Sequence, residues 1–93
     1  MTVTFRLAGF LRSFAEGAGA VRLDVRGGTV GDALRALGER HPGVSSRVLD
    51  EQGSLRRHVN VFVGDRNIRD TGGLATSLLD GSEISLLAAV SGG

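Results

Sequence analysis

Cysteine and lysine are both absent from this sequence of 93 residues, and each absence excludes a class of chemistry. Without cysteine the chain can form no disulfide, and it offers no thiolate nucleophile, zinc-binding thiolate or iron–sulfur ligand. Without lysine it has no side-chain amine for a Schiff base or an isopeptide bond. Covalent chemistry through these two side chains is therefore excluded.

Tryptophan and tyrosine are also missing, and 11 arginines nearly balance 10 acidic residues. A net charge of +1 produces no strong field, so neither nucleic acid nor an anionic membrane is expected as a partner. The densest basic cluster, Arg56-Arg57-His58, has no aromatic platform around it in the sequence. No segment resembles a membrane span or a signal peptide, and Met1 leads directly into a strand pattern, so a cytoplasmic location is expected.

The length allows one small domain, and we expect residues 1–93 to form it, with a flexible tail over 89–93. Alternation of apolar and polar residues predicts strands over 2–7, 21–26, 58–63 and 83–88, and a short edge strand over 66–69.

One amphipathic helix is predicted between the second and third of these strands. Thr29 is its expected N-cap, with Asp32 completing an imperfect capping box, and Pro42-Gly43 is expected to end it. Smaller apolar groups are expected to form short helical turns or to cover the core: Val44–Leu49, Leu74 with Leu78 and Leu79, and Phe10 with Leu11 and Phe14.

This order of elements predicts an α+β fold with a mixed sheet of four or five strands and one main helix packed on one face. The first and last strands of such an arrangement usually pair in the centre of the sheet. We therefore expect a β-grasp (ubiquitin-like) roll.

No ordinary active site is evident, so the chain is not expected to be an enzyme or to bind a metal. His41 and His58 lack the partners and spacing of a zinc site, and Asp50-Glu51 is typical of a solvated loop. Neither Gly27-Gly28 nor Gly72-Gly73 stands in a phosphate-binding motif, and no serine stands in a nucleophile elbow.

Glycine is abundant, at 15 residues, and two of them, Gly92 and Gly93, end the chain. Such an ending is compatible with a frayed terminus. It is also compatible with a slender tail that enters a tunnel in another enzyme, because glycine permits close backbone approach. The reactive group would then be the Gly93 carboxylate, which ATP would convert to an acyl-adenylate and sulfide to a thiocarboxylate.

Four segments carry a resemblance to the ubiquitin-like sulfur carriers: Val59–Val63, Gly72–Thr76, Asp80–Ile84 and Ala89–Gly93. This family includes the thiamin-pathway carrier (ThiS), the small subunit of molybdopterin synthase (MoaD) and a carrier that serves cysteine synthesis. The length and the second segment look most like the actinobacterial cysteine-pathway carriers. One departure is that family tails often carry proline and alanine where this chain has Ala88-Ala89 and Ser91.

The resemblance implies several partners and no bound cofactor. An ATP-dependent activating enzyme would consume ATP to adenylate Gly93, and a pyridoxal-phosphate synthase would accept the sulfur. A zinc metalloprotease would release the new amino acid from the tail.

Two other functions remain open at this stage. The chain could be the small subunit of molybdopterin synthase, which a larger subunit would bind permanently. It could also be a ubiquitin-like protein modifier or a plain interaction module.

Strand parity predicts the face that partners would contact. If Val61 and Ile84 face the helix, then Phe62, Leu87 and Ala89 face outward. These three residues should form an apolar patch at the base of the tail, although scattered surface apolarity would also account for them. The expected partner-binding residues are therefore Phe62, Leu87, Ala89, Val90 and Ser91.

Overall fold

The computed structural model describes residues 1–88, so the predictions made for the tail at 89–93 lie outside the described residues. The strands are β1 (Thr2–Leu7), β2 (Ala20–Asp24), β3 (Val59–Val63), β4 (Arg66–Asn67) and β5 (Glu83–Ala88). The α-helices are α1 (Val30–Arg40) and α2 (Pro42–Val48), and the 3₁₀ helices are η1 (Gly9–Ala15), η2 (Ile68–Asp70) and η3 (Gly73–Ala75).

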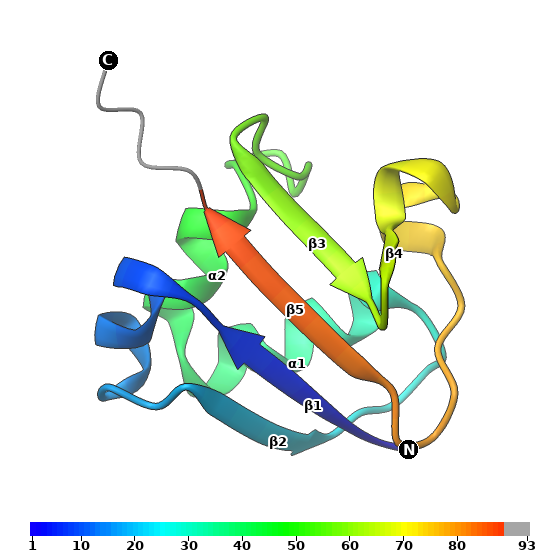
Figure 1. Ribbon diagram of the computed structural model, residues 1–93, viewed down its shortest axis with the longest axis horizontal. Coiled ribbons are helices and arrows are strands. Elements are labelled where there is room, and N and C mark those ends of the chain that lie inside the picture. Colours follow the sequence, from blue (N-terminus) through cyan, green and yellow to red (C-terminus); the bar gives the residue numbers. More distant parts are fainter. Residues whose placement is uncertain (89–93) are drawn as a thin grey trace.

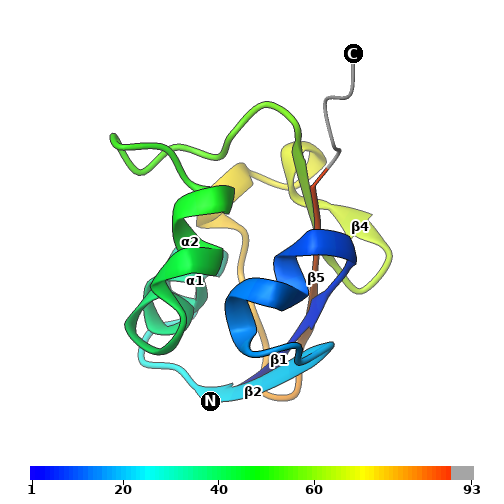
Figure 2. The same ribbon diagram turned by 90° about the vertical axis from the view of Figure 1, so that its left-hand side faces the viewer.

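The five strands form one mixed sheet in the order β2-β1-β5-β3-β4 (Figure 1). The first and last strands, β1 and β5, are parallel neighbours inside the sheet, and the other pairs are antiparallel. Both α-helices lie on one face of the sheet (Figure 2). The β-grasp prediction is therefore confirmed.

The core lies between the helices and the inner face of the sheet. Alternate residues of the central strands are buried there, as the period-two pattern predicts. From α1, the residues at helical spacing are fully buried. The principal members of the cluster are Val3, Phe5, Val30, Leu34, Leu37, Val59, Val61, Ile84 and Leu86.

The start of α1 forms the predicted capping box. Thr29 Oγ1 accepts a 3.2 Å hydrogen bond from the Asp32 amide, and Asp32 Oδ2 accepts from the Thr29 amide at 3.2 Å and the Thr29 hydroxyl at 2.9 Å. The hydrogen bond from the Thr29 side chain is the main reason that the pKa of Asp32 lies below its ordinary value of 3.8.

α1 ends at Arg40, and α2 begins at Pro42 after the single residue His41. Two consecutive helices therefore stand where one main helix and a short turn were predicted. Proline suits the first turn of a helix because the amide that it lacks has no partner there. Val44 and Val48 of α2 reach the core, and this burial favours a seven-residue helix over a single turn.

Three smaller predictions need correction. Phe10 does not cover the core: Leu11 and Ala15 are buried, whereas Phe10 is 39% exposed and its ring packs edge-on against the half-buried Phe14. The edge strand stops at Asn67, because η2 begins at Ile68 and buries that side chain. In the segment with Leu74, only that leucine lies in a helical turn (η3); the buried Leu78 and the 79% exposed Leu79 follow it outside the helix.

Candidate interaction site at the base of the tail

The tail begins where the central strand β5 ends. Ala88, the last described residue, pairs with Val59 of β3, and on the other side the Ala8 amide donates a 3.3 Å hydrogen bond to the Leu86 carbonyl. The base of the tail is therefore held by backbone contacts from both sides of the strand (Figure 1). Gly92 and Gly93, the expected reactive end, lie outside the described residues.

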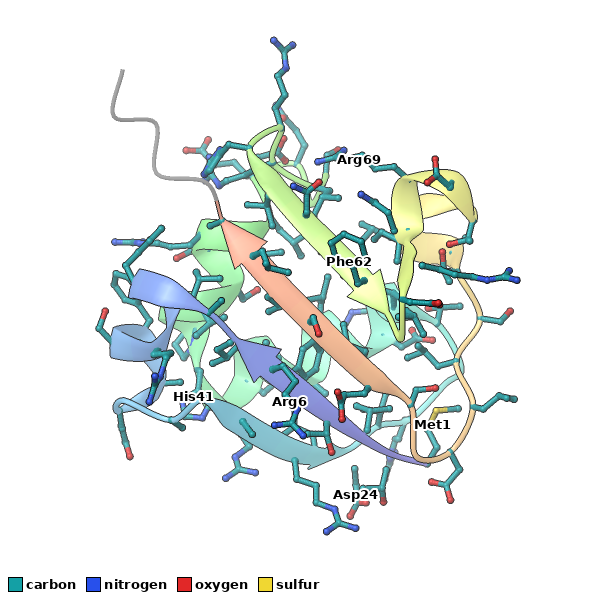
Figure 3. The ribbon with its side chains drawn as sticks, viewed as in Figure 1. Met1, Arg6, Asp24, His41, Phe62 and Arg69 are labelled. Atoms are coloured by element: carbon teal, nitrogen blue, oxygen red, sulfur yellow. The ribbon has the colours of Figure 1, made fainter. Side chains whose placement is uncertain are left out.

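Phe62 and Leu87 share the outer face of the sheet, which points away from the helices. Phe62 pairs with Ser85 and Leu87 pairs with Asn60, so the two apolar residues are diagonal neighbours across β3 and β5. Figure 3 shows Phe62 on this face. Leu87 is 41% exposed, but Phe62 is half-buried rather than fully exposed.

The surroundings of Phe62 explain its partial burial. Asn67 of β4 stands opposite Phe62, and both residues line an open hollow whose other lining residues are Asp65, Arg66, Asp70 and Thr71. The side-chain Nδ2 of Asn67 donates to Asn60 Oδ1 at 3.4 Å, and this polar contact borders the apolar patch. The patch thus contains Phe62 and Leu87, whereas Ala89, Val90 and Ser91 lie outside the described residues.

The neighbouring part of the outer face carries one ion pair. Arg6 Nη2 of β1 lies 3.3 Å from Glu83 Oε2 of β5, and both side chains are more than half exposed. A surface pair of this kind contributes little to stability. The outer face therefore carries this ion pair between β1 and β5, and the apolar pair of Phe62 and Leu87 lies farther along, between β3 and β5.

A second surface lies on the helix side of the same end of the molecule. Phe10, Ser46, Arg47, Arg56 and His58 line an open hollow of about 250 Å³, which we call the basic hollow. The sequence showed no aromatic platform around the cluster of Arg56 and His58, and folding brings one aromatic residue, Phe10 of η1, into the same hollow. No local pattern could have revealed that residues so distant in the chain line one hollow.

Arg69 is a further residue whose role sequence reasoning missed. It was expected on an edge strand, but it lies in η2 and its Nη2 points to the entry of β3. This nitrogen lies within hydrogen-bond distance of three carbonyl oxygens, at 3.1 Å from Arg56, 3.3 Å from Arg57 and 2.6 Å from Val59. Arg69 therefore fixes the segment that presents Arg56 and His58.

The residues considered for metal binding remain apart. Within residues 1–88, no group of three or more histidine, cysteine, aspartate or glutamate side chains is arranged to hold a metal ion. His41 follows the last residue of α1 and its amide donates to the Leu37 carbonyl at 2.7 Å, whereas His58 is exposed before β3. None of the helices in the described part of the chain is long and apolar enough to cross a membrane.

The glycines at the start of α1 also have a structural explanation. Asp32 Oδ2 accepts a 3.1 Å hydrogen bond from the Gly28 amide as well as those from Thr29. A carboxylate of the chain itself therefore occupies the donors that would otherwise attract a phosphate.

Comparison with known proteins identifies what this chain resembles. The model of the ThiS family matches residues 5–93. The chain is 37% identical over 95 residues to sulfur carrier protein CysO of Mycobacterium tuberculosis, with 100% of both chains covered.

Two solved structures extend the comparison. The crystal structure of SAMP1 from Haloferax volcanii has a TM-score of 0.85, with 37% identity and 100% of both chains covered. The structure of the Amycolatopsis orientalis BexX/CysO complex has a TM-score of 0.84, with 34% identity over 98% of this chain and 99% of that one. These similarities extend over nearly the whole length of the protein.

Proposed function

The chain belongs to the ThiS family, and on this basis we propose that it is a sulfur carrier for cysteine biosynthesis rather than an enzyme. The observation that carries the proposal is the similarity to a sulfur carrier protein, CysO, over the full length of both chains. The absence of cysteine agrees with it, because a carrier without a thiol must hold its sulfur elsewhere.

The proposed site of attachment is the carboxylate of Gly93. One carboxylate oxygen attacks the α-phosphorus of ATP, the bond to pyrophosphate breaks, and an acyl-adenylate forms. Hydrosulfide then attacks the carbonyl carbon, and AMP leaves with the electron pair of the broken C–O bond. The product is a thiocarboxylate, a soft nucleophile that can pass its sulfur to an acceptor.

The geometry at the end of β5 suits such a transfer. Ala88 is paired within the sheet, and five residues follow it, ending in Gly92 and Gly93. Five extended residues span about 17 Å. A carrier domain could therefore remain at the surface of its partner while the carboxylate reaches an active site in the interior.

We propose the patch of Phe62 and Leu87 as a docking face for the ATP-dependent activating enzyme, with Ala89, Val90 and Ser91 as further contacts. This apolar pair lies beside the base of the tail, so an enzyme that binds the tail would also contact the pair. The BexX/CysO complex concerns a similar protein bound to a partner. A pyridoxal-phosphate synthase as sulfur acceptor and a zinc metalloprotease belong to the same proposal.

A second candidate is a protein modifier, favoured by the structural similarity to SAMP1 and by 45% identity over 82 residues to small archaeal modifier protein 1 of Haloferax volcanii. A modifier would use the same adenylated Gly93 but form an amide with a lysine of another protein. Lysine conjugates in a lysate would favour this candidate. A small subunit of molybdopterin synthase would instead copurify stoichiometrically with its larger subunit.

Intact mass spectrometry tests the proposed function. The protein is incubated with extract of its source organism, ATP and sulfide, beside a variant that lacks Gly93. A mass gain equal to one oxygen replaced by sulfur is expected for the full chain only. No gain, in an extract shown to load another carrier, would contradict the sulfur-carrier proposal.

A further inference from the structure

The basic hollow presents cations that are held in place. The guanidinium carbon of Arg47 lies 4.1 Å from the centroid of the Phe14 ring, and this cation–π contact holds the side chain in place. Arg56 Nε donates a 3.1 Å hydrogen bond to the Ser46 carbonyl, so this side chain is also fixed. Because both arginines are already ordered, an anion that binds them costs less conformational entropy.

These cations have no acidic partner in the hollow. Its lining contains no aspartate or glutamate, and the ion pairs within residues 1–88 are Arg6–Glu83 and Arg35–Asp32, which lie elsewhere. Asp50 and Glu51 line an adjoining hollow that shares Arg56. Asp50 Oδ1 already accepts 2.9 Å hydrogen bonds from the amides of Gln52 and Ser54.

The hollow also lies at the base of the tail. His58 directly precedes Val59, which pairs with Ala88, and Phe10 follows two residues after Ala8, which is hydrogen-bonded to the end of β5. The start of β3, α2 and the end of β5 lie toward the same end of the molecule, with α2 in the helix layer and the two strands in the sheet (Figures 1 and 2). The end of β5 therefore lies between the apolar patch on the outer face and the basic hollow on the helix side.

We infer that the basic hollow is a second docking surface, and that it binds an acidic surface segment of the protein that loads sulfur onto the tail. This inference rests on the proposed function. Arg47 Nη1 donates a 3.3 Å hydrogen bond to Ser46 Oγ, whereas its Nη2 and both terminal nitrogens of Arg56 have no hydrogen-bond partner within residues 1–88. Ordered guanidinium groups with donors to spare suit carboxylates, which they can bind by two parallel hydrogen bonds. Phe10, 39% exposed, provides an apolar wall for the aliphatic part of an aspartate or glutamate side chain.

An acidic protein segment fits this surface better than nucleic acid does. Nucleic-acid affinity depends on neutralising many phosphates, and the hollow offers Arg47, Arg56 and His58 in a protein of net charge +1. Charge complementarity at a protein interface acts over a few residues and mainly raises the association rate.

The first test compares two charge-reversed variants in the sulfur-loading assay. One carries Arg47→Glu and Arg56→Glu; the matched control carries Arg22→Glu and Arg26→Glu, the same change in net charge at exposed positions on and beside the far edge strand β2. At low salt the first variant is expected to load sulfur about tenfold more slowly, and the control within about twofold of wild type. The wild-type rate should fall as salt increases.

The second test uses an acidic peptide and follows the backbone amides by NMR. Hexaglutamate should shift the amide signals of Ser46, Arg56 and His58, whereas hexaglutamine should not. In the variant with Arg47→Glu and Arg56→Glu, amide signals away from the hollow that match those of wild type would show that the variant is folded. Hexaglutamate should not shift the amide signals of this variant.

Several outcomes would overturn the inference. Equal loading by the two variants, or peptide shifts confined to another surface, would remove the docking role. Tighter binding of a single-stranded oligonucleotide than of hexaglutamate would assign the surface to nucleic acid. Shifts of the same amides on truncation after Ala88 would assign it to the chain's own tail. Failure of wild type to load at all would instead contradict the proposed function.

Discussion

Arg69 Nη2 lies 2.6 Å from the carbonyl oxygen of Val59, and through this contact η2 holds the first residue of β3. The same nitrogen lies within 3.3 Å of the carbonyls of Arg56 and Arg57. One guanidinium thus fixes the backbone beside the base of the tail. Its role is to position the basic hollow.

Replacement of Arg69 by methionine should lower the free energy of unfolding by about 1–2 kcal/mol, because carbonyl oxygens lose a charged donor. Urea unfolding at neutral pH measures this change. Arg66→Met is the matched control, since Arg66 is exposed on β4, and it should change stability by less than about 0.5 kcal/mol. Equal effects of the two substitutions would show that Arg69 does not hold the segment.

Thr29→Ala removes the N-cap of α1 and should destabilise the protein by about 1 kcal/mol. The side chain would no longer accept from the Asp32 amide, which would be left without its cap at the helix terminus. Thr29→Ser retains the hydroxyl and should recover most of the loss. The measurement is the midpoint of urea unfolding for wild type, Thr29→Ala and Thr29→Ser. A Thr29→Ser variant as unstable as Thr29→Ala would contradict the capping role.

Asp32 should make the free energy of unfolding depend on pH. Its pKa in the folded protein is lowered below 3.8, first by the Thr29 side chain and then by the backbone amide of Thr29. The stabilisation contributed by the ionised Asp32 carboxylate is therefore present above its unfolded-state pKa of 3.8. It is lost as the pH falls through the lower pKa that Asp32 has in the folded protein. Asp32→Asn should lose part of this dependence, and urea midpoints measured between pH 7 and pH 2 should give a flatter curve. A curve parallel to that of wild type would be inconsistent with this origin.

Phe62→Asp should slow sulfur loading by about tenfold while the fold persists, because it places a charge in the apolar patch with Leu87. Loading is followed by intact mass spectrometry, and the fold by circular dichroism. Arg22→Asp, on the same outer face but at β2, serves as the control. Unchanged loading of the Phe62 variant would exclude the patch as a docking face.

The regular elements were largely predictable because their signals are local. The alternation around Val3 and Phe5, and that around Ile84 and Leu86, each predicts a strand with one buried face. The capping box of Thr29 and Asp32 lies within four residues, so its residue types suffice to identify the start of α1. The β-grasp arrangement follows from the order of these elements.

The errors have a common physical cause. Phe10 and Leu11 are neighbours in sequence and equally apolar, but only the geometry of η1 against the sheet decides which of them is buried. The short edge strand ends early because burial of Ile68 favours η2 over continued pairing. Such choices depend on the packing partner, which composition and periodicity do not reveal.

Sequence by itself determined the absence of thiol and amine chemistry, the strands and helix that make up the sheet and its cover, and the resemblance of the chain to sulfur carriers. Only the tertiary structure decided which side chains meet at the base of the tail. Phe10, Arg47 and His58 come from η1, α2 and the entry to β3, and they converge because each element packs against the same core. Contacts between residues so far apart leave no local pattern, because the energy that brings them together is the burial of the core beneath them.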